Sequence, residues 1–177
     1  YNDELQDIPE GYSDRPNHMT EYELYDHGWL NTAWLINNVL TQANASSFIY
    51  WDAIWPDNGL IDMDFPWDES RWENDKGYSI NPWYYAMKHY SNHIDPGSRR
   101  VGVSGEHESL RSAYFISPDS SHMTAVLVNV SQEPVTRIIA LNNWEYQTSW
   151  TVQSTNGNFY QKDGSLAPDG SISLPGS

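Results

Sequence analysis

The sequence has no cysteine, and this absence excludes several kinds of chemistry. Without thiols there are no disulfide bonds, no thiolate-bound metal and no cysteine nucleophile. The six histidines show no HExxH or similar metal-binding spacing. A phosphate-binding P-loop, a dinucleotide fingerprint and a Gly-x-Ser-x-Gly elbow are also missing. We therefore expect neither a catalytic metal nor a cofactor.

Basic residues are scarce. Nine Lys and Arg stand against 24 Asp and Glu, which gives a formal net charge of -15. This charge opposes binding to nucleic acid and to anionic membranes, and no apolar run approaches the length of a membrane span. Such acidity is typical of a soluble secreted or salt-tolerant protein, so we expect a secreted or extracellular location. A neutral polysaccharide partner is unaffected by the charge.

Aromatic residues are what the sequence has in excess. They make up 14% of the chain, with nine Trp and twelve Tyr. Their rings are flat and amphipathic, so they suit the faces of sugars, and they also fill cores. For most of the nine Trp, packing in a core is the simpler interpretation.

The first part of the chain predicts a strand, a helix and a second strand. Residues 18–22 and Phe48 to Trp51 are expected to be short strands, the second one buried. Apolar residues spaced three and four apart predict a helix over 28–43 between them, with Asn44 as its end. Strands joined in this way predict a parallel βαβ unit.

A long segment, residues 52–80, follows the second strand and is predicted to be a loop. It is rich in acids and Trp, and loops of this length are usually functional or disordered. Its Trp residues argue against disorder. Asn81 is then expected to cap a helix whose first residue is Pro82.

The pattern changes near residue 98. Beyond it, short alternating runs are separated by turn residues about every ten to twelve positions, which is typical of an all-β sandwich. We therefore expect an α/β part over 1–97 and a small β-domain over 98–177. Two βα units cannot close a barrel, and two parallel strands leave bare edges. The first part is thus expected to need a partner, either a second chain or a missing N-terminal segment.

An ordered set of short motifs resembles glycoside hydrolase family 30, a family of retaining enzymes. The similarity runs from about residue 16 to the end and includes Met19-Thr20-Glu21, Tyr50-Trp51-Asp52-Ala53-Ile54-Trp55, Gly59-Leu60-Ile61, Lys76-Gly77-Tyr78, Tyr84 to Ser91 and Ile94 to Val101. The resemblance implies a (β/α)8 TIM barrel followed by a β-sandwich side domain. Residues 1–97 would then be the C-terminal part of the catalytic barrel, and residues 98–177 the side domain. Because the chain opens at Tyr1 without a Met, we expect it to be an excised piece.

The resemblance gives Glu21 the role of catalytic nucleophile, at the end of the seventh barrel strand. Glu23 is its rival, because strand alternation points both side chains to the same side. The family's acid/base, which stands in an Asn-Glu-Pro-like setting after the fourth strand, has no counterpart in this chain. The chain alone is therefore expected to lack half of its chemistry.

Four aromatic residues are candidates for sugar binding. Trp51 would form the hydrophobic floor beneath the sugar at the cleavage point. Trp55 and Trp67 could line outer subsites, although both could instead pack within the loop. Tyr1 matches a family Tyr that touches the nucleophile.

We therefore predict a retaining, xylanase-like O-glycosyl hydrolase that cleaves a plant-type polysaccharide, with xylan favoured, by double displacement. The resemblance implies that relatives which hold acidic branches do so with Arg residues in the loop after the eighth strand. The matching segment 52–57 contains no Arg, so uncharged chains are favoured over acidic branches. One alternative is a non-catalytic carbohydrate-binding or accessory module, because the acid/base is absent. Another is a purely structural half-barrel that pairs with a second chain.

Overall fold

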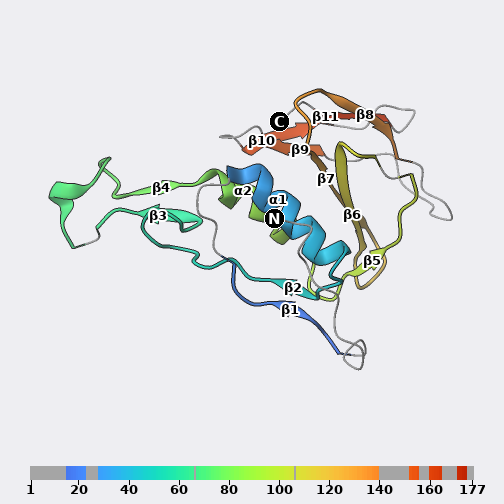
Figure 1. Cartoon of the computed structure of the whole chain (residues 1–177), viewed down its shortest axis with the longest axis horizontal. Coiled ribbons are helices and arrows are strands. Elements are labelled where there is room, and N and C mark those ends of the chain that lie inside the picture. The colour runs from blue at the N-terminus through green and yellow to red at the C-terminus, as the bar shows by residue number, and fades with distance from the viewer. Residues whose placement is uncertain are drawn as a thin grey trace.

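The computed structural model describes residues 15–22, 28–65, 67–105 and 107–139, together with three later strands. Two helices lie at the centre, and short strands surround them (Figure 1). The elements are β1 (His18–Met19), α1 (Gly28–Thr41), β2 (Ser47–Phe48), β3 (Ile61–Met63), β4 (Tyr78–Ile80), α2 (Pro82–Ser91), β5 (Arg99–Val101), β6 (Leu110–Ile116), β7 (Met123–Asn129), β8 (Val135–Ile138), β9 (Val152–Thr155), β10 (Tyr160–Gly164) and β11 (Ser171–Leu174).

The predicted βαβ unit is confirmed. Strands β1 and β2 pair in parallel, with Met19 opposite Phe48, and α1 connects them. The strands themselves are shorter than predicted. Their pairing nevertheless continues as single backbone bonds, from Ile49 N to Met19 O at 2.9 Å and from Trp51 N to Tyr22 O at 2.7 Å.

Helix α1 ends close to the predicted position. The amides of Gln42 and Ala43 both donate to Asn38 O, so this carbonyl of the last turn is satisfied. Asn44 then adopts a left-handed backbone with φ of 50°, a conformation that Asn tolerates well and that terminates helices. The predicted stop at Asn44 is thus confirmed.

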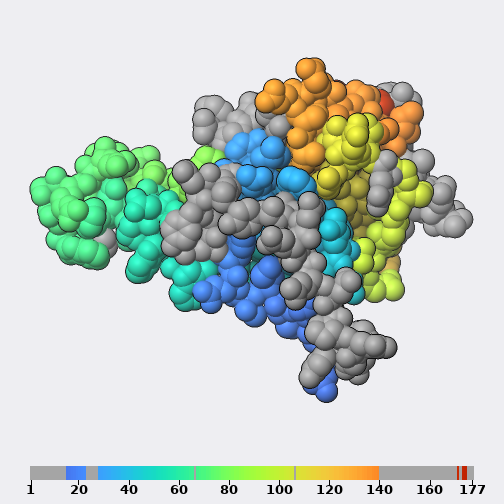
Figure 2. Space-filling model, viewed as in Figure 1, coloured from blue at the N-terminus to red at the C-terminus, as the bar shows by residue number. Residues whose placement is uncertain are grey.

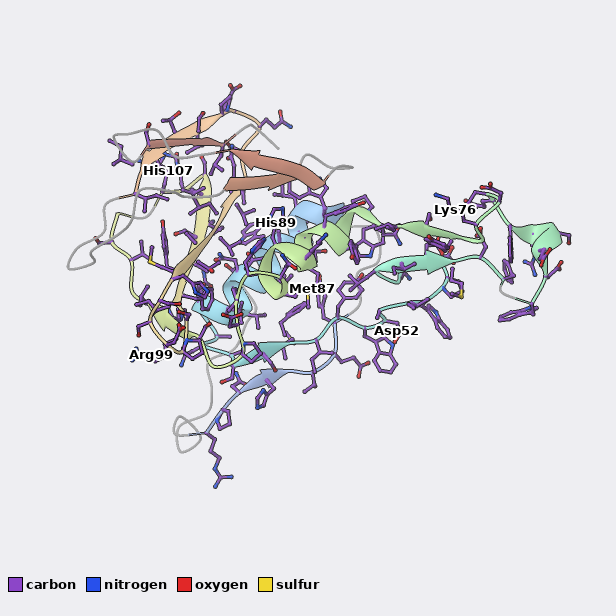
Figure 3. All side chains as sticks on the ribbon, turned by 180° about the vertical axis from the view of Figure 1, so that it is seen from behind. Asp52, Lys76, Met87, His89, Arg99 and His107 are labelled. Atoms are coloured by element: carbon purple, nitrogen blue, oxygen red, sulfur yellow. The ribbon has the colours of Figure 1, made fainter. Side chains whose placement is uncertain are left out.

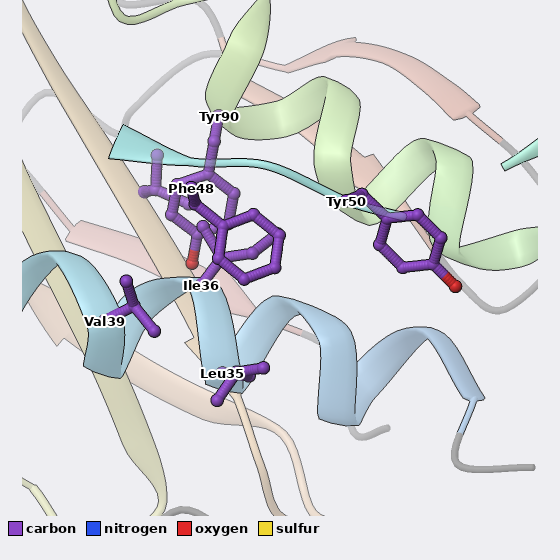
Figure 4. Close-up of a cluster of buried hydrophobic side chains, with 7 residues drawn as sticks. Leu35, Ile36, Val39, Phe48, Tyr50 and Tyr90 are labelled. Carbon is purple, nitrogen blue, oxygen red and sulfur yellow. The ribbon is translucent and has the colours of Figure 1, made fainter. Parts of the chain in front are cut away.

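One core links the two predicted parts of the chain. Leu35, Ile36 and Val39 of α1 pack in one cluster with Phe48, Tyr50, Tyr90 and Val126 (Figure 4). A second cluster joins Ala33 of α1, Ala86 of α2 and Val128 of β7. Helix α1 therefore contacts elements on both sides of residue 98. The division into 1–97 and 98–177 stays a prediction.

Helix α2 begins at Pro82, as predicted, but Asn81 acts differently from the expectation. Asn81 occupies the N-cap position without a side-chain capping bond. Its side-chain amide instead donates to Gly59 O at 2.8 Å. Asn81 thus holds the predicted N-cap position, but its side chain fastens the preceding segment and makes no bond to the helix.

The segment 52–80 is not simply a loop, and this prediction is wrong. Strands β3 and β4 form an antiparallel hairpin in which Ile61 pairs with Ile80 and Met63 with Tyr78. A 3₁₀ turn at Glu69–Arg71 lies between them. We call residues 61–80 the arm, because they project from the rest of the molecule (Figures 1 and 2). Strands of three residues are too short to give a readable alternation in the sequence.

The later strands form small antiparallel sheets. Strands β5, β6 and β7 make a three-stranded antiparallel sheet, which confirms that short strands separated by turns begin near residue 98. Strand β8 pairs with β11, and β9 pairs with β10. This arrangement is consistent with a β-sandwich-like domain. In the described part of the chain β1 and β2 are the one parallel pair, so a TIM barrel is not shown. Neither described helix combines the length and apolarity that crossing a membrane demands.

Candidate active site

Glu21 and Trp51 lie at the ends of neighbouring parallel strands. Glu21 follows β1 by one residue, Thr20, and is exposed. Trp51 lies beyond β2, and its backbone amide donates to Tyr22 O, next to Glu21, at 2.7 Å. Because parallel strands end at the same edge, the backbone brings both positions together there. This is the edge at which open and closed α/β folds place their ligands.

Side chains from Phe48 to Trp51 point alternately to the two faces of the strand pair, and this explains why Trp51 is exposed. Phe48 and Tyr50 face α1 and are buried. Ile49 and Trp51 face the other way, with 50% and 49% of their surfaces exposed. The expectation of a strand buried throughout is therefore wrong, because only one of its faces is covered. The role of Trp51 as a sugar floor stays a prediction.

The segment after Trp51 is held by side-chain hydrogen bonds that the sequence analysis did not predict. The Tyr50 hydroxyl donates to Asn58 O at 3.0 Å. Asn81 Nδ2 and Trp83 Nε1 both donate to Gly59 O, at 2.8 Å and 2.9 Å. These bonds join the start of α2 to the strand end. They fix the backbone on which the candidate aromatics stand.

Gly59 is required by the tightness of this turn. A Cβ at this position would meet the backbone nitrogen of Trp55 and would lie 2.6 Å from Ile61 O. Trp55 therefore stands on a closed turn, and 56% of its surface is exposed. The Trp51–Asp52 peptide bond, at the base of the same segment, is cis. In Figure 3, Asp52 marks this base and Lys76 marks the arm.

Trp67 lies on a different element from Trp51 and Trp55. It belongs to the end of the arm, where its ring packs edge-on against Phe65 at 6.0 Å. It is 78% exposed. The structure thus places Trp51 at a strand end, Trp55 on the turn before the arm and Trp67 on the arm itself. Tyr1 and Glu23 lie outside the described residues, so their roles stay predictions, as does that of Glu21.

The strongly shifted pKa values belong to residues away from this edge. Burial, followed by the charges of His93 and Lys88, lowers the pKa of His89 on α2 to about 4. Hydrogen bonds from Ser117 and Ser121 lower the pKa of Asp119 to about 2. Among the described residues, no group of three or more His, Asp or Glu side chains is arranged to hold a metal ion.

The fold is similar to that of glycoside hydrolases. No family model matches the sequence. The catalytic domain of glycoside hydrolase family 30 xylanase C from Talaromyces cellulolyticus matches with a TM-score of 0.73 and 19% identity, over 97% of this chain and 40% of that one.

Two bacterial structures give similar values. The family 30 subfamily 8 xylanase from Clostridium acetobutylicum matches with a TM-score of 0.71 and 20% identity, over 92% of this chain and 40% of that one. A conserved exported protein from Bacteroides fragilis matches with a TM-score of 0.70 and 18% identity, over 92% of this chain and 38% of that one. At these identities the similarity supports a distant family 30-like fold. The chain spans about two fifths of the structures it matches.

Proposed function

We propose that this chain is the C-terminal part of a secreted, retaining β-glycoside hydrolase that cleaves a plant-type polysaccharide, xylan in the first instance. The observation that carries the proposal is the meeting of Glu21 and Trp51 at one edge of the β1–β2 pair. A carboxylate beside an exposed indole can attack a sugar that is stacked on the ring. The similarity of the fold to xylanase structures supports this choice of reaction.

In this proposal Glu21 is the nucleophile of a double displacement. Retaining glycosidases use two carboxyl groups about 5 to 5.5 Å apart. Glu21 would attack the anomeric carbon and form a glycosyl-enzyme. The second carboxyl group would protonate the departing oxygen and then take a proton from the water that releases the sugar. Trp51 would hold the sugar ring by its apolar face.

The second carboxyl group is proposed to come from an N-terminal barrel half. Ile49, directly after β2, is half exposed, and the pair β1–β2 is two strands wide. Parallel sheets are usually covered on both faces and extended by further strands. A barrel half, as a preceding segment or as a second chain, would cover this face and complete the site.

The test is hydrolysis of xylan by the protein that contains both halves. Glu21→Gln removes the nucleophile and nearly preserves its shape, so kcat should fall by at least about 10³-fold. Glu108→Gln, an exposed site before β6, is the matched control and should keep full turnover. A 2-deoxy-2-fluoro xyloside should leave a covalent adduct on the peptide that contains Glu21, detected by mass spectrometry. Full turnover in Glu21→Gln would contradict the proposal.

The alternative is a non-catalytic carbohydrate-binding or accessory module. The absence of an Asn-Glu-Pro-like motif from the sequence is what favours it. The same protein distinguishes the two functions. Saturable xylan binding without release of reducing sugar, in the presence of both halves, would support the module.

A further inference from the structure

The end of the arm is held in one shape by its own hydrogen bonds. We call residues 64–77 the arm tip. Asp64 N donates to Gly77 O at 3.0 Å, and Glu73 N donates to Asp64 Oδ2 at 2.9 Å. Trp72 Nε1 donates to Phe65 O, also at 2.9 Å. These three bonds connect the two sides of the tip, so its backbone is organised before any ligand arrives.

Side-chain stacking completes this frame. The Arg71 guanidinium lies over the Phe65 ring, 3.3 Å from its centroid. Gly77 has φ of 69°, and a Cβ there would lie 2.8 Å from the Trp72 ring. The indole thus fits against the backbone where a side chain would otherwise be. Phe65 and Trp72 are both half-buried and belong to the frame.

Trp67 is the aromatic residue of the tip that this frame leaves facing outward. It is 78% exposed, whereas Phe65 supports one edge of its ring. Tyr78 at the start of β4 is 44% exposed, and Trp55 near the base of the arm is 56% exposed. Exposed aromatic rings therefore occur from the strand ends to the tip, along an element that projects from the molecule (Figures 1 and 2).

The charges of the tip select the kind of ligand. Residues 64–77 contain five acidic side chains and two basic ones, and one of the basic pair, Arg71, is stacked on Phe65. This balance opposes nucleic acids, anionic lipids and acidic glycans. Neutral sugars fit better, because their C–H faces stack on an indole and their hydroxyl groups can donate to carboxylates. Glu69, exposed two residues after Trp67, is such an acceptor.

We propose that the arm tip is a second, non-catalytic contact for a neutral polysaccharide, with Trp67 stacked on a sugar ring away from the bond that is cleaved. The identity of this polysaccharide rests on the proposed function. A contact beyond the cleavage point acts on long chains and is out of reach of short ones. The tip therefore adds affinity for the polymer and does not take part in bond breaking.

The experiment compares a polymer with a short substrate in the full-length protein. Trp67→Ala should raise KM for unbranched xylan by about two- to tenfold, the range expected for one aromatic contact. The rise in KM should be smaller for xylotriose. Trp67→Phe should recover part of the affinity for the polymer. Ile80→Ala is the matched control, because it removes an exposed apolar side chain from the same arm without removing a ring.

A second variant tests the frame. Gly77→Ala places a methyl group against Trp72 and should weaken binding of the polymer, as Trp67→Ala does, although Trp67 itself is kept. An equal KM for xylan in wild type and Trp67→Ala would overturn the proposal, even where Glu21→Gln abolishes turnover. Should the protein not hydrolyse xylan at all, retardation in gels that contain xylan still decides. Loss of retardation in Trp67→Ala supports the tip contact, and unchanged retardation overturns it.

Discussion

A mostly buried histidine gives the first prediction at the scale of single residues. The pKa of His89 is lowered from 6.5 to about 4 by burial and by the nearby His93 and Lys88. The unfolded chain therefore takes up a proton between about pH 6.5 and pH 4, while the folded chain does not. The free energy of unfolding should be highest above this window and should fall by about 2 to 3 kcal/mol as the pH decreases through it.

Urea unfolding at a series of pH values measures this effect. His89→Gln should reduce the slope of stability against pH within the window, because the group that titrates is gone. Ser91→Ala, at an exposed position on the same helix, is the control and should keep the slope, because a serine hydroxyl does not titrate in this window. The stabilisation that Asp119 contributes is lost only as the pH falls from 3.8 to about 2, which lies below the window of His89, so the two effects do not overlap. An unchanged slope in His89→Gln would show that burial does not hold this imidazole neutral.

At the scale of elements, one hydroxyl joins the two helices. Tyr90 of α2 is 4% exposed, and its hydroxyl donates to Ala33 O of α1 at 2.9 Å. Tyr90→Phe removes this bond and keeps the ring in the core, so the free energy of unfolding should fall by about 1 kcal/mol.

Thermal and urea unfolding of Tyr90→Phe test this tie. Tyr84→Phe serves as the control on the same helix, because Tyr84 is only half-buried and lies outside the core cluster. A variant Tyr90→Phe as stable as the wild type would mean that water replaces the hydroxyl at no cost.

The two helices were predictable because each carries a long local signal. Apolar spacing and Asn44 define α1 to within two residues, and Pro82 marks the start of α2. The buried polar residues Asn37 and Asn38 were missed, because periodicity of apolar residues does not register polar groups inside a core. Local patterns thus located the elements but not everything that they bury.

The arm, and the hydrogen bonds that hold the segment after Trp51, could not be predicted because they depend on contacts between residues far apart in the sequence. Gly59 O receives bonds from Asn81 and Trp83, which lie 22 and 24 residues further along the chain. Such contacts depend on the folded path and leave no periodic trace in the sequence. The positions of Glu21 and Trp51 at strand ends could be predicted from the sequence, because each lies at the end of a predicted short strand and in a motif that resembles family 30. That motif does not reveal which side chains hold them there.

At the scale of the whole molecule, the exposed face of the β1–β2 pair predicts an assembly. Mixed with the proposed N-terminal barrel half as a separate polypeptide, the chain should form a 1:1 complex by light scattering. It should also melt at a higher temperature than alone, because binding to the folded state stabilises it. The contact should include Ile49, which is 50% exposed beside Trp51.

A pair of charge substitutions locates the contact. Ile49→Asp should weaken the complex, since it places a carboxylate on the face to be covered. Val103→Asp, at a position 47% exposed after β5, should leave the complex intact. A chain that remains a stable monomer when the proposed N-terminal half is added would contradict this prediction, because the β1–β2 face would then bind no partner.

The shared packing of α1 has a consequence for how this protein can be rearranged. Its Ile36 and Ala33 sides meet β2 and α2 as well as Val126 and Val128 of the β7 strand. Strand β7 therefore cannot be exchanged independently of helix α1. A replacement taken from another protein would have to fit this helix surface. Any misfit there would reach Met19, which packs on the same cluster two residues before Glu21.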